Sequence, residues 1–184
     1  FSLWDTYRAL HPLYTITQPD KINDIVKSFL AIYQQQGRLP VWHLMGNETN
    51  CMNANHSIPV IVDAYFKGYR DYDTALAYEA LKKTAMQTRD GMDYIQKLQY
   101  IPADSLTETV ANALEYAIDD WCIARMAKDM NKMEDYDYFS KRANLYKLYF
   151  DKETTFMRGK LKNGQWREPF NPLASAHRKD DYVE

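Results

Sequence analysis

Apolar residues recur at helical spacing over several long stretches of the chain. The clearest stretch runs from Pro19 to Gly37, where one stripe is formed by Ile22, Ile25, Val26, Phe29, Leu30 and Tyr33. Because residues three and four positions apart share a face of an α-helix, this spacing predicts an amphipathic helix. Asp20 can cap its first turn, and Gly37 is of the type that commonly follows a last turn.

Four further stretches predict helices of two kinds. Residues 58–67, which Ser57 can cap, are apolar on most sides, and such a helix is expected to be buried. Residues 73–87 and 134–150 each carry a single apolar stripe instead. A long helix over 106–128 is predicted between them, because Ser105 and Glu108 have the spacing of a capping box.

The two kinds of predicted helix alternate along the chain. Each inner, more apolar helix is followed by an outer, amphipathic one; the pairs are residue 8 onward with 20–36, 58–67 with 73–87, and 106–128 with 134–150. Such pairs are typical of an (α/α)6 toroid, in which six inner helices surround a central pocket. An ordinary antiparallel helical bundle has the same periodicity and stays open as an alternative. We predict an all-α fold that forms about half of a toroid.

One segment departs from helical spacing. Residues 155–170 lack a repeating apolar stripe, and Asn163-Gly164 is a strong signal for a two-residue hairpin turn. We therefore predict a small β-hairpin near 155–170, inserted in the helical domain.

Composition and charge narrow the class of function. The 184 residues are 46% hydrophobic and 26% charged, as in ordinary globular proteins. The net charge is -2 and no basic stripe occurs, which argues against a surface that follows nucleic-acid phosphates. The longest apolar stretch, Ile58 to Phe66, is interrupted by Pro59 and Asp63 and is too short for a membrane span. Because the chain begins at Phe1 and not at a methionine, we expect it to be part of a longer protein.

The loops before the inner helices hold the most unusual polar and aromatic residues. In a toroid these loops converge on one mouth of the ring; they are Trp4–Arg8, Trp42–Cys51, Pro102–Ser105 and Asp180–Glu184. Each carries a carboxylate, which can accept hydrogen bonds from sugar hydroxyls, and three of them add an aromatic ring, which can stack on a sugar. Glycoside hydrolysis needs two such acids across the scissile bond. Acidic loops are common, however, and are usually only solvated.

Four segments of the sequence resemble glycoside hydrolase family 92. The matching segments are Phe1–Arg8, Gly46–Met52 with His56 after it, Glu115–Ala124 and Tyr182–Glu184. The resemblance implies a calcium-dependent exo-α-mannosidase that inverts the anomeric configuration, secreted or periplasmic, and acting on mannose-containing glycans. It also implies that residues 1–184 are a single piece of a larger catalytic domain, whose N-terminal β-sandwich and second half of the toroid belong to the remainder of the same polypeptide.

The resemblance assigns roles to five residues. Glu184 matches the general acid, Asp5 matches the aspartate that binds hydroxyls of the terminal mannose, and Trp4 beside it is expected to bind substrate as well. Glu48 and His56 fall in a loop that resembles part of the pocket wall. The catalytic base and the calcium ligands are expected beyond Glu184. One departure is visible, because Asn53-Ala54 stands where the family pattern has an Ile-Gly pair.

Several less specific interpretations stay open beside this one. The chain could be an (α/α)6 glycosidase of another specificity, or a non-catalytic helical module for interaction or carbohydrate binding. We expect His43 and His56 to form hydrogen bonds and not a metal site, because no further ligands accompany them at a workable spacing. Asp119 and Asp120 are expected to brace helices and Cys122 to be a buried free thiol, whereas His11 and His177 are expected on the surface or in loops.

Overall fold

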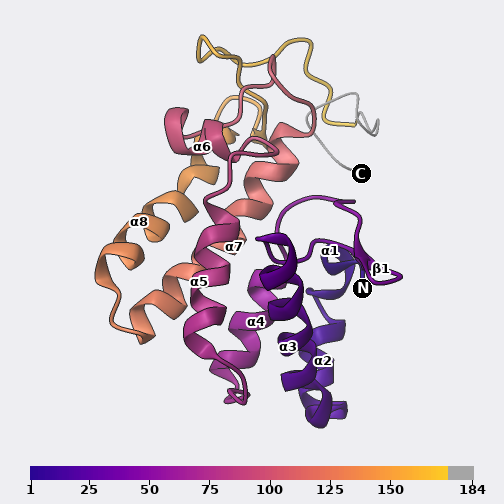
Figure 1. Cartoon of the computed structure of the whole chain (residues 1–184). Helices are drawn as coiled ribbons and strands as arrows, with labels where there is room; N and C mark the ends of the chain where they lie inside the picture. The colour runs from indigo at the N-terminus through magenta and orange to yellow at the C-terminus, as the bar shows by residue number, and fades with distance from the viewer. Residues whose placement is uncertain (174–184) are drawn as a thin grey trace.

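The computed structural model describes residues 1–173, and α-helices make up most of this part of the chain (Figure 1). The helices are α1 (Leu3–Thr6), α2 (Leu10–Thr17), α3 (Pro19–Gln36), α4 (Ser57–Phe66), α5 (Thr74–Ala85), α6 (Met92–Leu98), α7 (Thr109–Asp129) and α8 (Met133–Ala143). A 3₁₀-helix, η1 (Leu145–Tyr149), follows α8. Two small antiparallel hairpins complete the described part: β1 (His43–Leu44) with β2 (Asn47–Glu48), and β3 (Phe150–Asp151) with β4 (Phe156–Met157).

The helices are arranged as three inner–outer pairs. The inner helices α2, α4 and α7 pack side by side in that order, and the outer helices α3, α5 and α8 run back along them. The connections within the pairs lie at the lower end of Figure 1, so α4 and α7 begin at the opposite end, near α1 and the 42–56 loop. The predicted all-α class and the three predicted pairs are confirmed.

The apolar pattern explains which helices lie inside. Helix α4 has Ile58 and Ile61 completely buried and is covered on most sides, as its all-round apolar sequence predicts. Helix α3 instead buries one stripe that includes Val26 and Phe29, and its remaining side faces solvent. Gly37 ends α3 in the left-handed conformation, with φ of 76°, which a residue without Cβ adopts at little cost.

The predicted capping box before α7 is wrong. Helix α7 begins at Thr109, and Glu108 precedes it with φ of 57°. The preceding segment is held by tertiary contacts: the Ala103 amide donates to the Lys160 carbonyl at 2.7 Å, and the Lys162 amide donates to the Asp104 carboxylate at 3.1 Å. These bonds keep the segment out of the helix, so the local cap signal at Ser105 is overridden.

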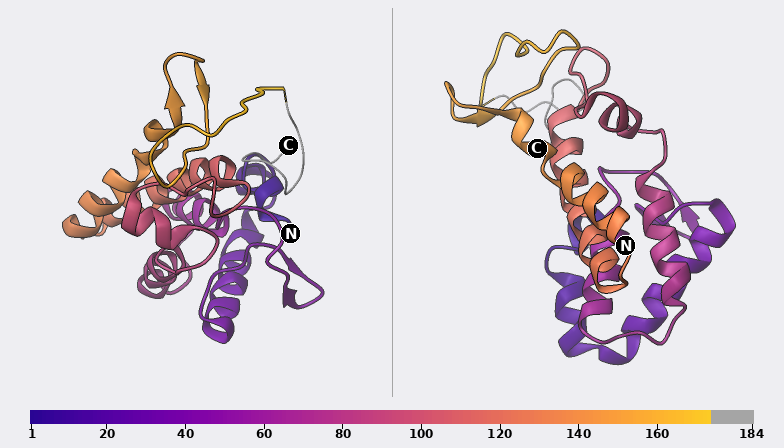
Figure 2. Two further views of the ribbon diagram at one scale, coloured as in Figure 1. Left: turned by 90° about the horizontal axis from the view of Figure 1, so that it is seen from above. Right: turned by 90° about the vertical axis from the view of Figure 1, so that its left-hand side faces the viewer.

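The end of the described chain also differs in detail from what the sequence predicts. Helix α8 stops at Ala143, short of the predicted 150, and η1 continues it in a tighter form. The Asn163-Gly164 turn is present and is closed by the Leu161 amide, which donates to the Gln165 carbonyl at 2.8 Å. Next to this turn, backbone pairing across the hairpin is limited to a single β-bridge. The paired strands β3 and β4 come earlier in the sequence. Figures 1 and 2 show this segment at one end of α7, far from α2 and α3.

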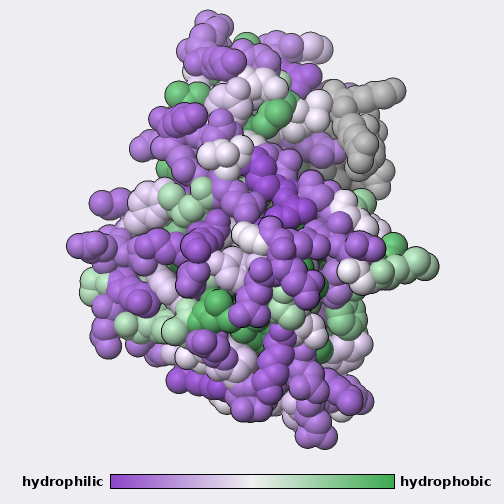
Figure 3. Space-filling model, viewed as in Figure 1, coloured by the Kyte–Doolittle hydropathy of each residue, from purple (hydrophilic) through white to green (hydrophobic). Residues whose placement is uncertain are grey.

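No helix among residues 1–173 is long and apolar enough to cross a membrane. The face seen in Figure 3 is largely hydrophilic, with apolar residues only in small groups. Cys122 is buried and free, as predicted.

A buried ion pair joins the last two helices. The Arg142 guanidinium donates to the Asp120 carboxylate at 2.7 Å from Nε and 2.6 Å from Nη2, and Nη2 also donates to the Ala85 carbonyl at 3.0 Å. This bidentate geometry satisfies both charged groups and ties α5, α7 and α8 together. The predicted bracing role of Asp120 is confirmed.

Replacing one partner of this pair should destabilise the full-length protein strongly. In Asp120→Ala the Arg142 charge stays buried without its carboxylate, and we expect the free energy of unfolding to fall by about 3–5 kcal/mol. Denaturant unfolding measures the change. Asp137→Ala, at an exposed aspartate of α8, is the control and should cost less than about 0.5 kcal/mol. Equal effects of the two substitutions would contradict the account.

Candidate functional site

A buried histidine lies where α1, α4 and α7 meet. The His56 side chain is 0% exposed; its Nε2 lies 2.9 Å from Glu115 Oε2 and its Nδ1 lies 3.3 Å from Asp119 Oδ1. Glu115 and Asp119 are four residues apart on α7, so both carboxylates project from the same helix face. The Tyr7 ring stacks on the His56 ring, with centroids 3.9 Å apart.

These contacts determine the charge of the imidazole. Burial alone would lower the pKa of His56, but Asp119 and Glu115 outweigh it and raise the pKa to about 9. Burial likewise opposes ionisation of Glu115, yet His56, Arg8 and Tyr7 hold the pKa of this carboxyl below its ordinary value. Burial raises the pKa of Asp119. At neutral pH, His56 is therefore a buried cation held between the carboxyl groups of Glu115 and Asp119, of which Glu115 lies nearer.

Glu115 also holds the segment that carries Trp4 and Asp5. It accepts hydrogen bonds from the Tyr7 hydroxyl at 3.1 Å and from Arg8 Nη2 at 3.0 Å. The Arg8 guanidinium in turn lies over the Trp4 ring, 5.1 Å from its centroid. Asp5 is exposed and Trp4 is half-buried, so both side chains are accessible at this end of the helices. Three of the predicted site residues, Trp4, Asp5 and His56, thus belong to one connected cluster.

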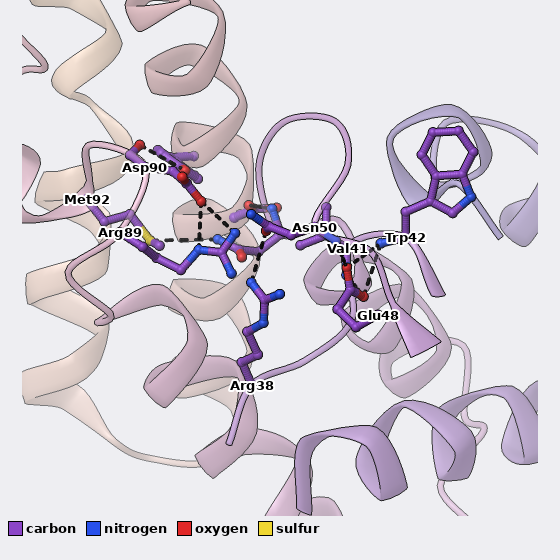
Figure 4. Close-up of polar contacts among 11 residues, drawn as sticks. Arg38, Val41, Trp42, Glu48, Asn50, Arg89, Asp90 and Met92 are labelled. Atoms are coloured by element: carbon purple, nitrogen blue, oxygen red, sulfur yellow. Dashed lines mark hydrogen bonds and ion pairs between the residues drawn. The ribbon is translucent and has the colours of Figure 1, made fainter. Parts of the chain in front are cut away.

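Glu48 organises the neighbouring loop. Its carboxylate accepts hydrogen bonds from three backbone amides: Val41 at 2.7 Å, Trp42 at 3.1 Å and Asn50 at 2.6 Å (Figure 4). Arg38 contacts the same loop through a 3.0 Å hydrogen bond from Nη1 to Asn50 Oδ1. Glu48 therefore shapes the wall of the site through the backbone. A direct contact with sugar stays a prediction for this residue.

The next turn of this loop contains left-handed residues other than glycine. Met52 has φ of 73° and Ala54 has φ of 64°. Ala54 stands where the family pattern has glycine, and the left-handed conformation costs a residue with Cβ about 1–2 kcal/mol. The loop nevertheless keeps this path, because the Asn55 amide donates to Asp119 Oδ2 at 2.9 Å and the helix α4 follows at once.

A cleft of about 240 Å³ opens at the same end of the inner helices. One wall is the Asn50–Ala54 loop, and the other comes from the start of α7 and the segment before it, including Glu108, Asn112 and Tyr116. The convergence of the loops before α4 and α7, predicted from the toroid pattern, is confirmed by this lining.

The remaining sequence-based assignments have mixed outcomes. Glu184 and His177 lie outside the described residues, so the role of Glu184 stays a prediction. The expectation that His11 is a surface residue is wrong: it is 3% exposed and packs against the rings of Phe1 and Phe29. Burial lowers the pKa of His11. Sequence reasoning omitted Glu115 from the site, although its spacing of four residues from Asp119 could have indicated a shared helix face.

The described residues do not provide a metal site by themselves. No group of three or more His, Cys, Asp or Glu side chains within 1–173 is placed to hold a metal ion.

Paired inner and outer helices, with carboxylates, aromatic rings and a cleft gathered at one end, define an all-helical domain with a candidate site at that end. Comparison with known proteins identifies the family to which this domain belongs. Residues 1–184 match the glycosyl hydrolase family 92 catalytic domain, and the chain belongs to this family.

Three relatives show how far the similarity extends. A family 92 α-mannosidase from Bacteroides thetaiotaomicron, solved with mannoimidazole, is 42% identical and has a TM-score of 0.94 over 100% of this chain and 25% of its own. An inverting mannosidase of the same family and species is 35% identical, with a TM-score of 0.87 over 93% of this chain and 24% of its own. An uncharacterized secreted glycosidase from Arthroderma benhamiae is 29% identical over 84% of this chain and 22% of its own length. The chain therefore spans about a quarter of these proteins.

The charge on His56 predicts a pH-dependent stability. A histidine whose pKa rises on folding stabilises the protein fully below its unfolded pKa of about 6.5. His56 contributes about 3 kcal/mol to the free energy of unfolding in this way, and this contribution is lost as pH rises through about 9. We expect His56→Gln in the full-length protein to be less stable at pH 6 and to lack this decline.

Unfolding free energies measured from pH 6 to pH 10 test this expectation. His43→Gln serves as the control, because burial lowers the pKa of His43 and the substitution removes no such contribution. Between pH 7 and pH 10, the unfolding free energy of the wild type should fall more than that of His56→Gln. An equal or smaller fall in the wild type would refute the charged state of His56.

Proposed function

We propose that the protein is an exo-acting α-mannosidase that hydrolyses terminal α-mannosides with inversion. Support comes from membership in the family 92 catalytic domain and from the similarity to a solved α-mannosidase and a solved inverting mannosidase. A catalytic-domain match along the whole chain favours this function over a non-catalytic helical module.

The observation that carries the proposal is the way Trp4 and Asp5 are held. The ion pair of His56 and Glu115 fixes Tyr7 and Arg8, and with them the short helix α1 on which Trp4 and Asp5 lie. An exposed carboxylate can accept hydrogen bonds from two hydroxyl groups of one sugar, and an indole face can cover its C–H groups. Terminal mannose is the proposed ligand at this place.

The proposed reaction is a single displacement. Glu184, in its protonated form, donates its proton to the glycosidic oxygen while the bond from that oxygen to the anomeric carbon breaks. A carboxylate elsewhere in the polypeptide removes a proton from water, whose oxygen bonds to the anomeric carbon from the opposite face. Inverting enzymes separate the two carboxyl groups by roughly 6.5–9.5 Å to leave room for this water.

Calcium is proposed as the cofactor on the basis of the family alone. Calcium prefers several oxygen ligands, and in this proposal they come from parts of the protein beyond this chain. Residues 1–173 contain no group of His, Cys, Asp or Glu side chains placed to hold the ion. The proposed substrates are mannose-containing glycans, and secreted or periplasmic location is proposed from the secreted fungal relative.

We also propose that the remainder of the same polypeptide covers an apolar face of this chain. On α7, Trp121 is 58% and Ile118 is 40% exposed, and Tyr146 of η1 is 38% exposed beside them. Contiguous exposed apolar residues usually mark an interface. The next inner helix of the toroid is the proposed occupant, since α7 would be its neighbour in the ring.

A lysine in this face should destabilise the full-length protein. Ile118→Lys would bury an unpaired charge in the proposed interface, so we expect a lower melting temperature and a loss of at least about 2 kcal/mol. Gln34→Lys, at an exposed position of the outer helix α3, is the control and should be nearly neutral. Full tolerance of Ile118→Lys would count against the proposed covering.

The hydrolytic function is tested with two substrates of different leaving-group ability. Full-length protein should release mannose from an α-1,2-linked mannobiose, with β-mannose as the first anomer detected by NMR. Glu184→Gln should lower kcat for mannobiose about 10²–10⁴-fold, because the departing sugar needs a proton. The same substitution should lower kcat for 4-nitrophenyl α-mannoside much less, since nitrophenolate leaves without needing a proton.

Asp5→Asn tests the binding role by a different pattern. It should impair both substrates, because both present the same terminal mannose, whereas Asp20→Asn on α3 should impair neither. Wild-type protein that releases no mannose from either substrate would refute the proposed function. Equal losses for both substrates in Glu184→Gln would refute the role of Glu184 alone.

A further inference from the structure

Arg8 lies beside the residues that are proposed to bind terminal mannose. We propose that Arg8 is a positioning residue of this site, whose guanidinium group holds the Trp4 indole in the orientation that receives the sugar ring. The identity of the ligand rests on the proposed function. The fixed orientation of the indole rests on the contacts of Arg8 itself.

The guanidinium group makes three contacts at once. Its Nη2 donates to Glu115 Oε1 at 3.0 Å, and its central carbon lies 5.1 Å from the centroid of the Trp4 ring and 5.0 Å from that of the Tyr7 ring. Glu115 is a firm anchor, because its side chain is only 15% exposed and its Oε2 lies 2.9 Å from His56 Nε2. Arg8 therefore connects the indole to the face of α7 that organises the site.

The planar shape of the guanidinium group makes this combination of contacts possible. A guanidinium can lie over an aromatic ring while an N–H group at its edge donates to a carboxylate. A lysine ammonium is a compact point charge on a flexible stem, without a plane or a fork. Because Arg8 covers one face of the Trp4 ring, the sugar of this proposal stacks on the opposite face, through its C–H groups.

Arg8 contributes little to the attachment of α1 itself. Its side chain is 50% exposed, and an ion pair at such a position adds little to the free energy of unfolding. The segment stays attached through Tyr7, whose ring stacks on His56 and whose hydroxyl donates to Glu115 at 3.1 Å. The loss of Arg8 should therefore release the indole while the backbone of α1 stays in place.

Two substitutions of Arg8 in the full-length protein test this inference. Arg8→Lys keeps the charge but loses the planar group, and Arg8→Met keeps only the length of the side chain. A cation–π contact at an exposed site accounts for about a 2- to 5-fold effect, so KM should rise by about that factor in Arg8→Lys and by at least as much in Arg8→Met. The value of kcat should not change, because the lost contact binds ground state and transition state alike.

The same rise in KM is expected for α-1,2-linked mannobiose and for 4-nitrophenyl α-mannoside, because both present the same terminal mannose. Melting temperatures should equal that of the wild type in both Arg8 variants. A wild-type KM in Arg8→Lys would overturn the inference. A KM that rises only together with a fall in melting temperature would also overturn it, since that result indicates a structural role.

Arg70→Lys is the matched control. The Arg70 guanidinium carbon lies 3.8 Å from the centroid of the Tyr65 ring, and the Arg70 side chain is 48% exposed, much as in Arg8. Arg70 lies between α4 and α5, at the end of the helices opposite the candidate site (Figure 1). The same loss of a planar cation at this place should change neither KM nor kcat.

A measurement without hydrolysis separates failure of this inference from failure of the proposed function. Fluorine NMR of full-length protein labelled with fluorotryptophan reports on the indole, and Trp4→Phe assigns the resonance. The wild type should show one narrow Trp4 resonance, and Arg8→Lys should broaden or split it, because the indole then takes more than one orientation. A single, equally narrow resonance in both proteins would overturn the positioning role, whether or not the wild type releases mannose.

Discussion

The ion pair between His56 and Glu115 is the interaction on which the arrangement of this site depends. Burying a charged imidazole is costly, and two carboxylates of one α7 face together with the stacked Tyr7 ring offset that cost. The same Glu115 carboxylate receives Tyr7 and Arg8, so the N-terminal segment, the start of α4 and the middle of α7 are joined at one point. The contacts of Tyr7 and Arg8 hold the segment that carries Asp5, and Trp4 adds its own contact with Arg8.

The inner–outer pairing explains why this cluster lies at an open end of the helices. Helices α2, α4 and α7 begin at the same end, and their outer partners return the chain to it each time. Side chains from the loops before α4 and α7 therefore meet beside the cleft, although they are far apart in sequence. Because the chain belongs to family 92, this end of the helices is the proposed place of sugar binding.

Much of the helical framework could be predicted from periodicity alone. The stripe of α3, the buried character of α4 and the glycine after α3 follow local rules, and the structure has all of them. The start of α7 could not be predicted, because contacts with Lys160 and Lys162, more than fifty residues away, override the cap signal at Ser105. Within the site, His56 was identified through the family pattern. The buried state of His11 and the central position of Glu115 depend on tertiary packing, which spacing alone does not reveal.

The central claim is that His56 is a buried cation in the folded protein, and its titration tests that claim most directly. NMR of the full-length protein labelled at histidine, with His56→Gln to assign the resonance, measures the pKa of this residue. The account predicts a pKa of about 9, well above the ordinary value. A pKa at or below about 6.5 would mean that His56 is neutral at physiological pH and that the ion pair does not hold the site together.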